Sequence, residues 1–249
     1  MPLTEHLREL RNRFMVCLIA LVVAAVPGWM AYEPILNTLQ APLKSQRGEL
    51  NFGTLTSPLA VQIQVSIFIA LIITSPIWIY QVWAFIVPGL KKNEKWTALA
   101  FMFSAIPLFI TGCYLAYVTL PKAIVILLGF TPSEGVNIVP ADDYLTFTTR
   151  FIVAFGFAFL LPVFLVGLNL IGVLSAANML RGWRFAVVGL FIFAALITPT
   201  PDPWTMFGLA LPMCVLYFCA YGVAWILDRR KAKRRPDWSN LDDSEASPL

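Results

Sequence analysis

With 249 residues, of which 59% are hydrophobic and only 13% charged, the chain does not have the composition of an ordinary soluble domain. Its mean hydropathy of +0.75 indicates an all-α integral membrane protein that forms a single domain. The formal net charge of +4 is no sign of nucleic-acid binding, because the basic residues cluster beside the apolar stretches, where they orient membrane helices.

Six apolar stretches are candidates for transmembrane helices, each of which needs about 20 residues to cross a bilayer core. They cover residues 14–32, 65–87, 96–120, 151–174, 185–198 and 204–227, so that one membrane domain extends over residues 1–227. The loops at 33–64 and 121–150 are long, and the first has room for short helices of its own. Residues 228–249 are charged and lack apolar periodicity, so we expect a disordered tail.

Two features of these stretches predict the shape of the domain. Proline removes a backbone hydrogen bond and bends a helix, and four of the stretches contain one: Pro76, Pro107, Pro162 and Pro212. Four bent helices favour a concave, cup-like scaffold over a straight bundle. The fifth stretch reaches only about 21 Å as a helix, less than a bilayer core of about 30 Å. We therefore expect the bilayer to thin there, or the PTPDP turn at 199–203 to lie below the surface.

The distribution of Lys and Arg predicts the orientation. Fourteen of the eighteen lie in the N-terminal segment, the turn at 88–95, the loop at 175–184 and the tail, which all fall on one side of six spans. The positive-inside rule assigns that side to the cytoplasm, so both termini are expected there. The basic part of the tail would also lie near anionic lipid of the bilayer.

The N-terminal segment EHLRELRNR, residues 5–13, is amphipathic and leads into the first apolar stretch. One helical face is apolar at three- and four-residue steps: Leu3, Leu7, Leu10 and Phe14. On the other face Glu9 precedes Arg13 by four residues, the favourable order for a helical ion pair. Two interpretations remain open: a membrane-surface helix whose arginines set the topology, or a segment whose Glu9 carboxylate receives a basic ligand.

The apolar stretches lack the groups that membrane enzymes and pumps use. No charged residue occurs between Glu49 and Lys91, between Lys95 and Lys122, or between Arg150 and Arg181, whereas ion-coupled transporters usually keep ionisable groups at mid-membrane. The sole histidine, His6, rules out a histidine-based metal cluster, and no phosphate-binding loop or dinucleotide motif occurs. We therefore expect no enzyme and no cofactor, but a scaffold, receptor or translocation component. A six-span small-molecule transporter or channel is the alternative.

Four segments connect the chain to a known family. They are PLTEHLRELRNR at 2–13, APL at 41–43, SPIWIYQVWAFIVPGLKKNEK at 75–95 and TPTPDP at 198–203. In this order, and with the same number of spans, the chain from residue 2 to about residue 227 resembles TatC, the multi-spanning receptor subunit of the twin-arginine protein translocase.

The resemblance implies a component of the bacterial or archaeal cytoplasmic membrane that binds twin-arginine signal peptides and helps export folded proteins. Members of the family form a six-helix cup, work with the single-span subunits TatA and TatB, and use the proton-motive force. A homo-oligomer within the receptor complex is a further expectation, and no nucleic-acid partner is expected.

The resemblance also implies a binding site. Glu9 and Glu94 match the family's two cytoplasmic signal-binding glutamates, and a guanidinium pairs well with a carboxylate through two parallel hydrogen bonds. Without the family, Glu94 would more simply be a solvated turn residue paired with a neighbouring lysine. Other matching positions are the basic residues Arg11 and Arg13 and three residues at which changes impair relatives: Pro42, Phe85 and Pro88.

The chain departs from the family at two positions. Many relatives have FE-x-P in the fourth span, where this chain has FLLP with Leu160 in place of the acid. A glutamine common early in the last span corresponds to Met206. We interpret the two as a coupled replacement in which both side chains face one groove on the concave side.

Overall fold

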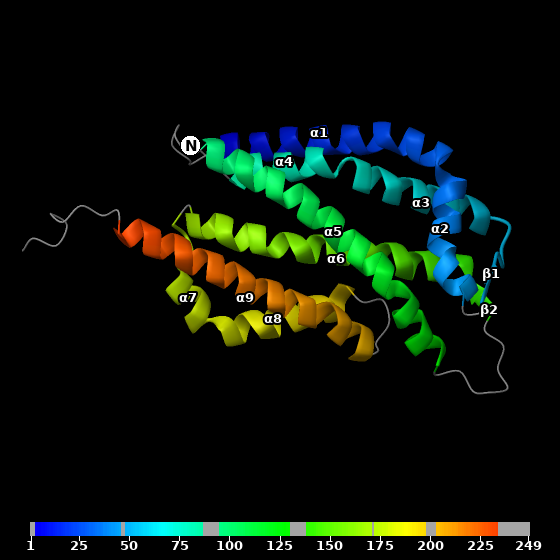
Figure 1. The fold of residues 1–249 in the computed structure, drawn as a ribbon. Helices are drawn as coiled ribbons and strands as arrows, with labels where there is room; N and C mark the ends of the chain where they lie inside the picture. The colour runs from blue at the N-terminus through cyan, green and yellow to red at the C-terminus, as the bar shows by residue number, and fades with distance from the viewer. Residues whose placement is uncertain are drawn as a thin grey trace, which may run out of the picture.

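The computed structural model describes residues 3–45, 48–86, 95–129, 138–170, 172–197 and 203–233 (Figure 1). Four of its helices are long and apolar enough to cross a membrane: α1 (Leu3–Met30), α5 (Lys95–Leu128), α6 (Ala141–Leu170) and α9 (Pro203–Lys233). The bent pair α3 (Ser57–Ile73) and α4 (Ser75–Ile86) makes a fifth candidate if it is one span. The prediction of a helical membrane protein is confirmed. The sixth span stays a prediction, because the apolar helix α8 (Trp183–Ile197) is shorter than the others.

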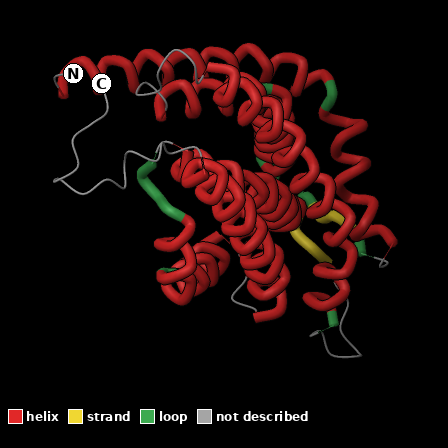
Figure 2. The backbone as a smooth tube through the Cα atoms, turned by 60° about the vertical axis from the view of Figure 1, so that its left-hand side comes forward, coloured by secondary structure: helices red, strands yellow, loops and turns green. Residues whose placement is uncertain are grey.

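Helix α6 lies at the centre of the molecule. It packs against α5 on one side and α9 on another, and α3 also contacts it (Figures 1 and 2). Over half of its residues are buried, among them Phe151, Phe155 and Leu160. A helix that is apolar on all faces is stable only when other helices or lipid surround it, which explains the central place of this segment.

Glycines allow the close approach of α5 to α6. A Cβ atom on Gly112 would lie 2.6 Å from the backbone oxygen of Phe155, and one on Gly156 would lie 2.6 Å from the ring of Phe109. The same holds between α1 and α3, where a Cβ on Gly28 would lie 2.6 Å from the backbone oxygen of Ser66. Small residues at such contacts are typical of membrane helices, whose association depends on close packing because lipid is as apolar as the side chains.

The four prolines do not act alike. The second predicted span breaks at Thr74, just before Pro76, and the two halves enclose a bend of 59°. The backbone amide and the hydroxyl of Thr74 both donate to the Ala70 backbone oxygen at the end of α3, at 2.9 Å and 2.7 Å. The helices α5, α6 and α9 instead continue through Pro107, Pro162 and Pro212. Of these four prolines only Pro76 follows the end of a helix, and the bends predicted at the other three stay predictions.

The helices extend well beyond the predicted spans. Helix α1 begins at Leu3, so the amphipathic segment and the first span are one continuous helix. The loop predicted at 121–150 is wrong at both ends, because α5 continues to Leu128 and α6 begins at Ala141. The loop predicted at 175–184 contains the short helix α7 (Ala176–Arg181). Hydropathy marks only the part of a helix that lies in hydrocarbon, and polar turns outside the bilayer extend it without cost.

A small parallel sheet, which we did not predict, joins the two long connections at the end of the molecule opposite the N-terminus (Figure 1). The first long loop contains a short helix, α2 (Tyr32–Ser45), as we expected from its length. Strand β1 (Glu49–Asn51) follows this helix and pairs with β2 (Ile138–Pro140). The Tyr144 hydroxyl donates to the Leu39 oxygen, and the Ser57 hydroxyl donates to Asp142, each at 2.7 Å. These contacts hold α2, α3 and α6 together at this end.

The predicted disordered tail is wrong for its first residues, since α9 continues to Lys233. The carboxylate of Asp228 accepts a hydrogen bond from Asn169 Nδ2 at 2.9 Å and one from the backbone amide of Ala176, the first residue of α7, at 2.8 Å. Between these residues the chain turns at Gly172, whose φ of +82° favours glycine. Asp228 therefore connects the ends of α6, α7 and α9. Residues 234–249 lie outside the described part.

Candidate functional site

The helices α3 and α4, on either side of the bend at Thr74, run back along α1 toward its N-terminal end (Figure 1). The N-terminal turns of α1 therefore lie beside α4. This arrangement brings Glu9 and Arg13, predicted from the N-terminal motif, close to Phe85 from the third motif. It also brings in two residues that were not predicted as site residues, His6 of α1 and Gln81 of α4.

The Glu9–Arg13 ion pair predicted from the spacing is confirmed. Arg13 donates from Nη2 to Glu9 Oε1 at 2.6 Å and from Nε to the same oxygen at 3.0 Å. Its third bond, from Nη1 to Gln81 Oε1 at 3.1 Å, ties α1 to α4. Because Arg13 uses only Oε1, the second carboxylate oxygen of Glu9 is not occupied by this arginine.

An aromatic contact lies on the same side of the helix pair. The rings of His6 and Phe85 are stacked with their centroids 4.5 Å apart and an interplanar angle of 21°. Glu9 and Arg13 are each about a quarter exposed, at 28% and 25% of their side chains, so the pair is open to a ligand from solvent. A carboxylate with one oxygen available, next to an aromatic surface, is suited to a guanidinium group.

Not all predicted site residues come together. Pro42 is buried in α2, at the other end of α1 from Glu9 and separated from it by roughly 30 Å of helix. The structure therefore does not place it in the same site. Arg11 is exposed, and its Nη2 donates to Oδ1 of its neighbour Asn12 at 3.5 Å. Glu94 and Pro88 lie outside the described residues.

The two positions that differ from the family lie far apart. Phe151 and Phe155 of α6 line one cleft with Gly208 and Pro212 of α9. Near the other end of the helix pair, Asn169 of α6 donates a hydrogen bond to Asp228 of α9. Each α6 residue therefore lies level with the α9 residue whose number is 57–59 higher. Met206 is thus level with residues 147–149, about 16–20 Å along α6 from Leu160. In addition, Leu160 is buried, with 2% of its surface exposed, so it lies in the core and not on a groove wall. The hypothesis of a shared groove is wrong.

Gln81, like His6, is a residue of this site that sequence reasoning missed. It lies four residues before Phe85, so a helix over 75–86 places both on one face, and this periodicity could have revealed it. Its partner on α1 was not predictable, because the contact joins residues 68 positions apart across the bend at Thr74.

Comparison with known proteins shows the family to which the chain is similar. Residues 5–212 match the family model described as Sec-independent protein translocase protein (TatC). The TatC protein of Xylanimonas cellulosilytica is 48% identical over 240 residues, which cover 94% of this chain and 87% of that protein. The TatC protein of Aquifex aeolicus is 33% identical over 236 residues, which cover 93% of this chain and 98% of that protein.

The fold is similar to that of a solved structure. The crystal structure of the twin-arginine translocase receptor TatC superimposes with a TM-score of 0.79 and 33% sequence identity, covering 89% of this chain and 98% of that one. A second crystal structure of the receptor, in the detergent DDM, also gives a TM-score of 0.79. These matches do not favour the small-molecule transporter alternative. The extent of the family match and the shared fold show that this chain, a multi-pass membrane protein, belongs to the TatC family of Sec-independent protein translocase proteins.

Proposed function

We propose that this chain is the signal-peptide receptor of a twin-arginine translocase and that Glu9 binds an arginine of the signal. The observation that carries the proposal is the Glu9 carboxylate, which Arg13 holds through one oxygen while the other oxygen is left for a ligand. Arg13 is in turn held by the side-chain oxygen of Gln81. A signal arginine bonds Oε2 first. It engages both oxygens in parallel once Arg13 gives up Oε1, and Gln81 retains the displaced Arg13.

The remaining assignments rest on the same proposal. Glu94 binds the second arginine of the pair, the basic residues Arg11 and Arg13 complete the recognition segment, and Phe85 and Pro88 form the neighbouring surface. The receptor delivers folded proteins to a pathway driven by the proton-motive force, together with single-span TatA and TatB subunits and further copies of itself. The protein crosses the cytoplasmic membrane six times, with α8 as the short fifth span.

The binding site is tested by Glu9→Gln, which removes the charge and keeps the shape. We expect binding of a synthetic twin-arginine signal peptide to weaken about tenfold. This loss lies between the cost of removing an exposed ion pair and that of removing a shielded one. The measurement is peptide anisotropy against the purified full-length protein, with a twin-lysine peptide for comparison.

The matched control is Glu5→Gln, since Glu5 is an exposed acid one turn earlier on α1. It should leave the dissociation constant unchanged. In Glu9→Gln the preference for arginine over lysine should also shrink, because the bidentate partner is gone. Equal affinity of Glu9→Gln and the unaltered protein, with the same melting temperature, would exclude Glu9 from the site.

The orientation is tested with a reporter enzyme that is active only outside the cytoplasm. Fused after Leu249 it is expected to be silent, because the basic residues at both ends keep both termini inside. Fused after Ser133, in the connection between α5 and α6, it is expected to be active. An active fusion at Leu249 would mean an odd number of spans, and α8 would then be the helix that does not cross.

A further inference from the structure

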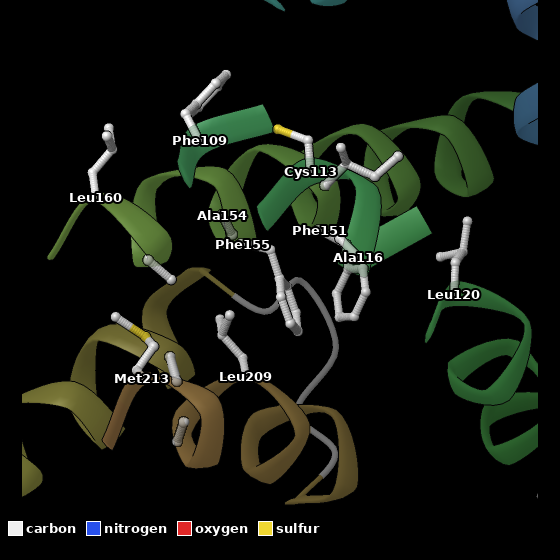
Figure 3. Packing of buried hydrophobic residues seen from close by; sticks show 14 of the residues in the cluster. Phe109, Cys113, Ala116, Leu120, Phe151, Ala154, Phe155, Leu160, Leu209 and Met213 are labelled. Atoms are coloured by element: carbon white, nitrogen blue, oxygen red, sulfur yellow. The ribbon is translucent and has the colours of Figure 1, made fainter. Parts of the chain in front are cut away.

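A cleft of about 180 Å³ opens between α5 and α9. Its floor is formed by two rings of α6, Phe151 and Phe155, which point toward α9 (Figure 3). Its walls include Leu115, Thr119 and Lys122 of α5 and Gly208 of α9. None of these residues belongs to the proposed signal-peptide site on α1 and α4.

The packing of the helices explains why the cleft exists. Both α5 and α9 pack closely on α6 but make few contacts with each other. Gly208 adds no side chain to fill the space, and a Cβ built on it would have no atom within 4 Å. The Thr119 hydroxyl donates within its own helix, to the oxygens of Leu115 at 2.9 Å and Ala116 at 3.0 Å. The cleft is thus apolar along its length, with one cation, Lys122, among its described lining residues.

The position of Lys122 along α5 sets the depth of the cleft in a membrane. Helix α5 begins at Lys95, and the 27 residues from there to Lys122 span about 40 Å. This distance matches a bilayer including its headgroups, about 40–45 Å. Lys122 therefore lies at the headgroup level of the leaflet opposite Lys95. Thr119 and Leu115 lie about 5 and 10 Å nearer the bilayer centre, at the level of the acyl chains.

We infer that this cleft binds an anionic phospholipid, with its phosphate at the Lys122 ammonium and one acyl chain over Phe151 and Phe155. An apolar slot with a single cation among its described lining residues has the polarity of such a lipid. No acidic side chain is among the described residues that line it, so the attraction of Lys122 for an anion is not offset there. The bound lipid fills the gap between α5 and α9 and so supports their separation.

The test is native mass spectrometry of the full-length protein in mild detergent, titrated with phosphatidylglycerol or phosphatidylcholine of identical acyl chains. We expect the protein to retain phosphatidylglycerol about fivefold better, the factor that one basic residue near an anionic surface contributes. Lys122→Gln should abolish this preference. Lys44→Gln, which removes an exposed cation on α2, should keep it.

The acyl-chain part of the site is tested by Gly208→Leu, which fills the cleft. It should lower retention of both lipids at least about threefold. Gly189→Leu on α8 is the matched control, because a Cβ there also meets nothing within 4 Å, and it should retain both lipids. Equal retention of the two lipids by the unaltered protein would overturn the inference, as would a preference that survives Lys122→Gln. Full retention by Gly208→Leu would also overturn it and would leave the cleft to a transmembrane helix of a partner protein.

Discussion

Replacing Leu160 by glutamate is expected to lower the free energy of unfolding by at least about 2.5–3.5 kcal/mol, the cost of a charged side chain at mid-membrane. Leu160 is 2% exposed and belongs to the hydrophobic core around α6. It lies nine residues, about 14 Å, from Asn169 at the polar end of α6, and this is about half the thickness of a bilayer core. Thermal unfolding in detergent would measure the loss.

The control Leu160→Gln separates charge from shape. A buried carboxyl group costs less when it is protonated than when it is ionised, so the folded protein bears the full cost of the introduced glutamate only at high pH. The destabilisation of Leu160→Glu should therefore be smaller at pH 5 than at pH 8, whereas that of Leu160→Gln should not depend on pH. If Leu160→Glu destabilises the protein equally at both pH values, the introduced side chain reaches water and is not buried.

Adding Met206→Gln should not restore the stability lost in Leu160→Glu. Met206 on α9 and Leu160 on α6 are about 16–20 Å apart, measured along the α6 axis. The stability changes caused by two mutations at such a distance usually add to within about 0.3–0.5 kcal/mol. Recovery of more than that would mean that the helices rearrange to bring the residues together.

The parts of the structure that could be predicted from the sequence are those set by local composition. Uncharged stretches predicted a helical membrane protein, the spacing of Glu9 and Arg13 predicted their ion pair, and Pro76 predicted the bend before α4. The short fifth apolar stretch also corresponds to a short helix, α8. Each of these features depends on residues within a few positions of one another.

The parts that could not be predicted depend on distant residues or on helix outside the bilayer. Hydropathy could not find the start of α6 or the end of α9, because the residues there are helical but largely polar. The end of α5 was placed before Pro121, although the helix continues over the apolar residues 123–128. Strand β1 has only three residues, and its partner is about 90 positions away, so no periodicity could reveal it. Nor does a proline by itself predict a break, since neighbouring helices support α6 through Pro162.

Asp228 is the clearest example of a residue whose role depends on tertiary contacts. In the sequence it is the first of a charged run, whereas in the structure it accepts bonds from Asn169 and from the amide that begins α7. Asp228→Ala is expected to lower the free energy of unfolding by about 2–4 kcal/mol, since hydrogen bonds to charged groups contribute about 1.5–3 kcal/mol each. Asp228→Asn should lose about half as much, because its amide oxygen still accepts one bond while its NH₂ accepts none.

The loss should be local before it is global, because α7 is held to α9 at its first residue. Hydrogen exchange in Asp228→Ala should therefore speed up in residues 176–181 ahead of the centre of α6, whose contacts with α5 are untouched. Asp143→Ala is the matched control, since Asp143 is an exposed acid at the other end of α6, and it should change neither exchange nor melting temperature. Unchanged exchange in α7 after Asp228→Ala would show that the Ser175 cap and the apolar contacts of Met179 hold this helix without the carboxylate.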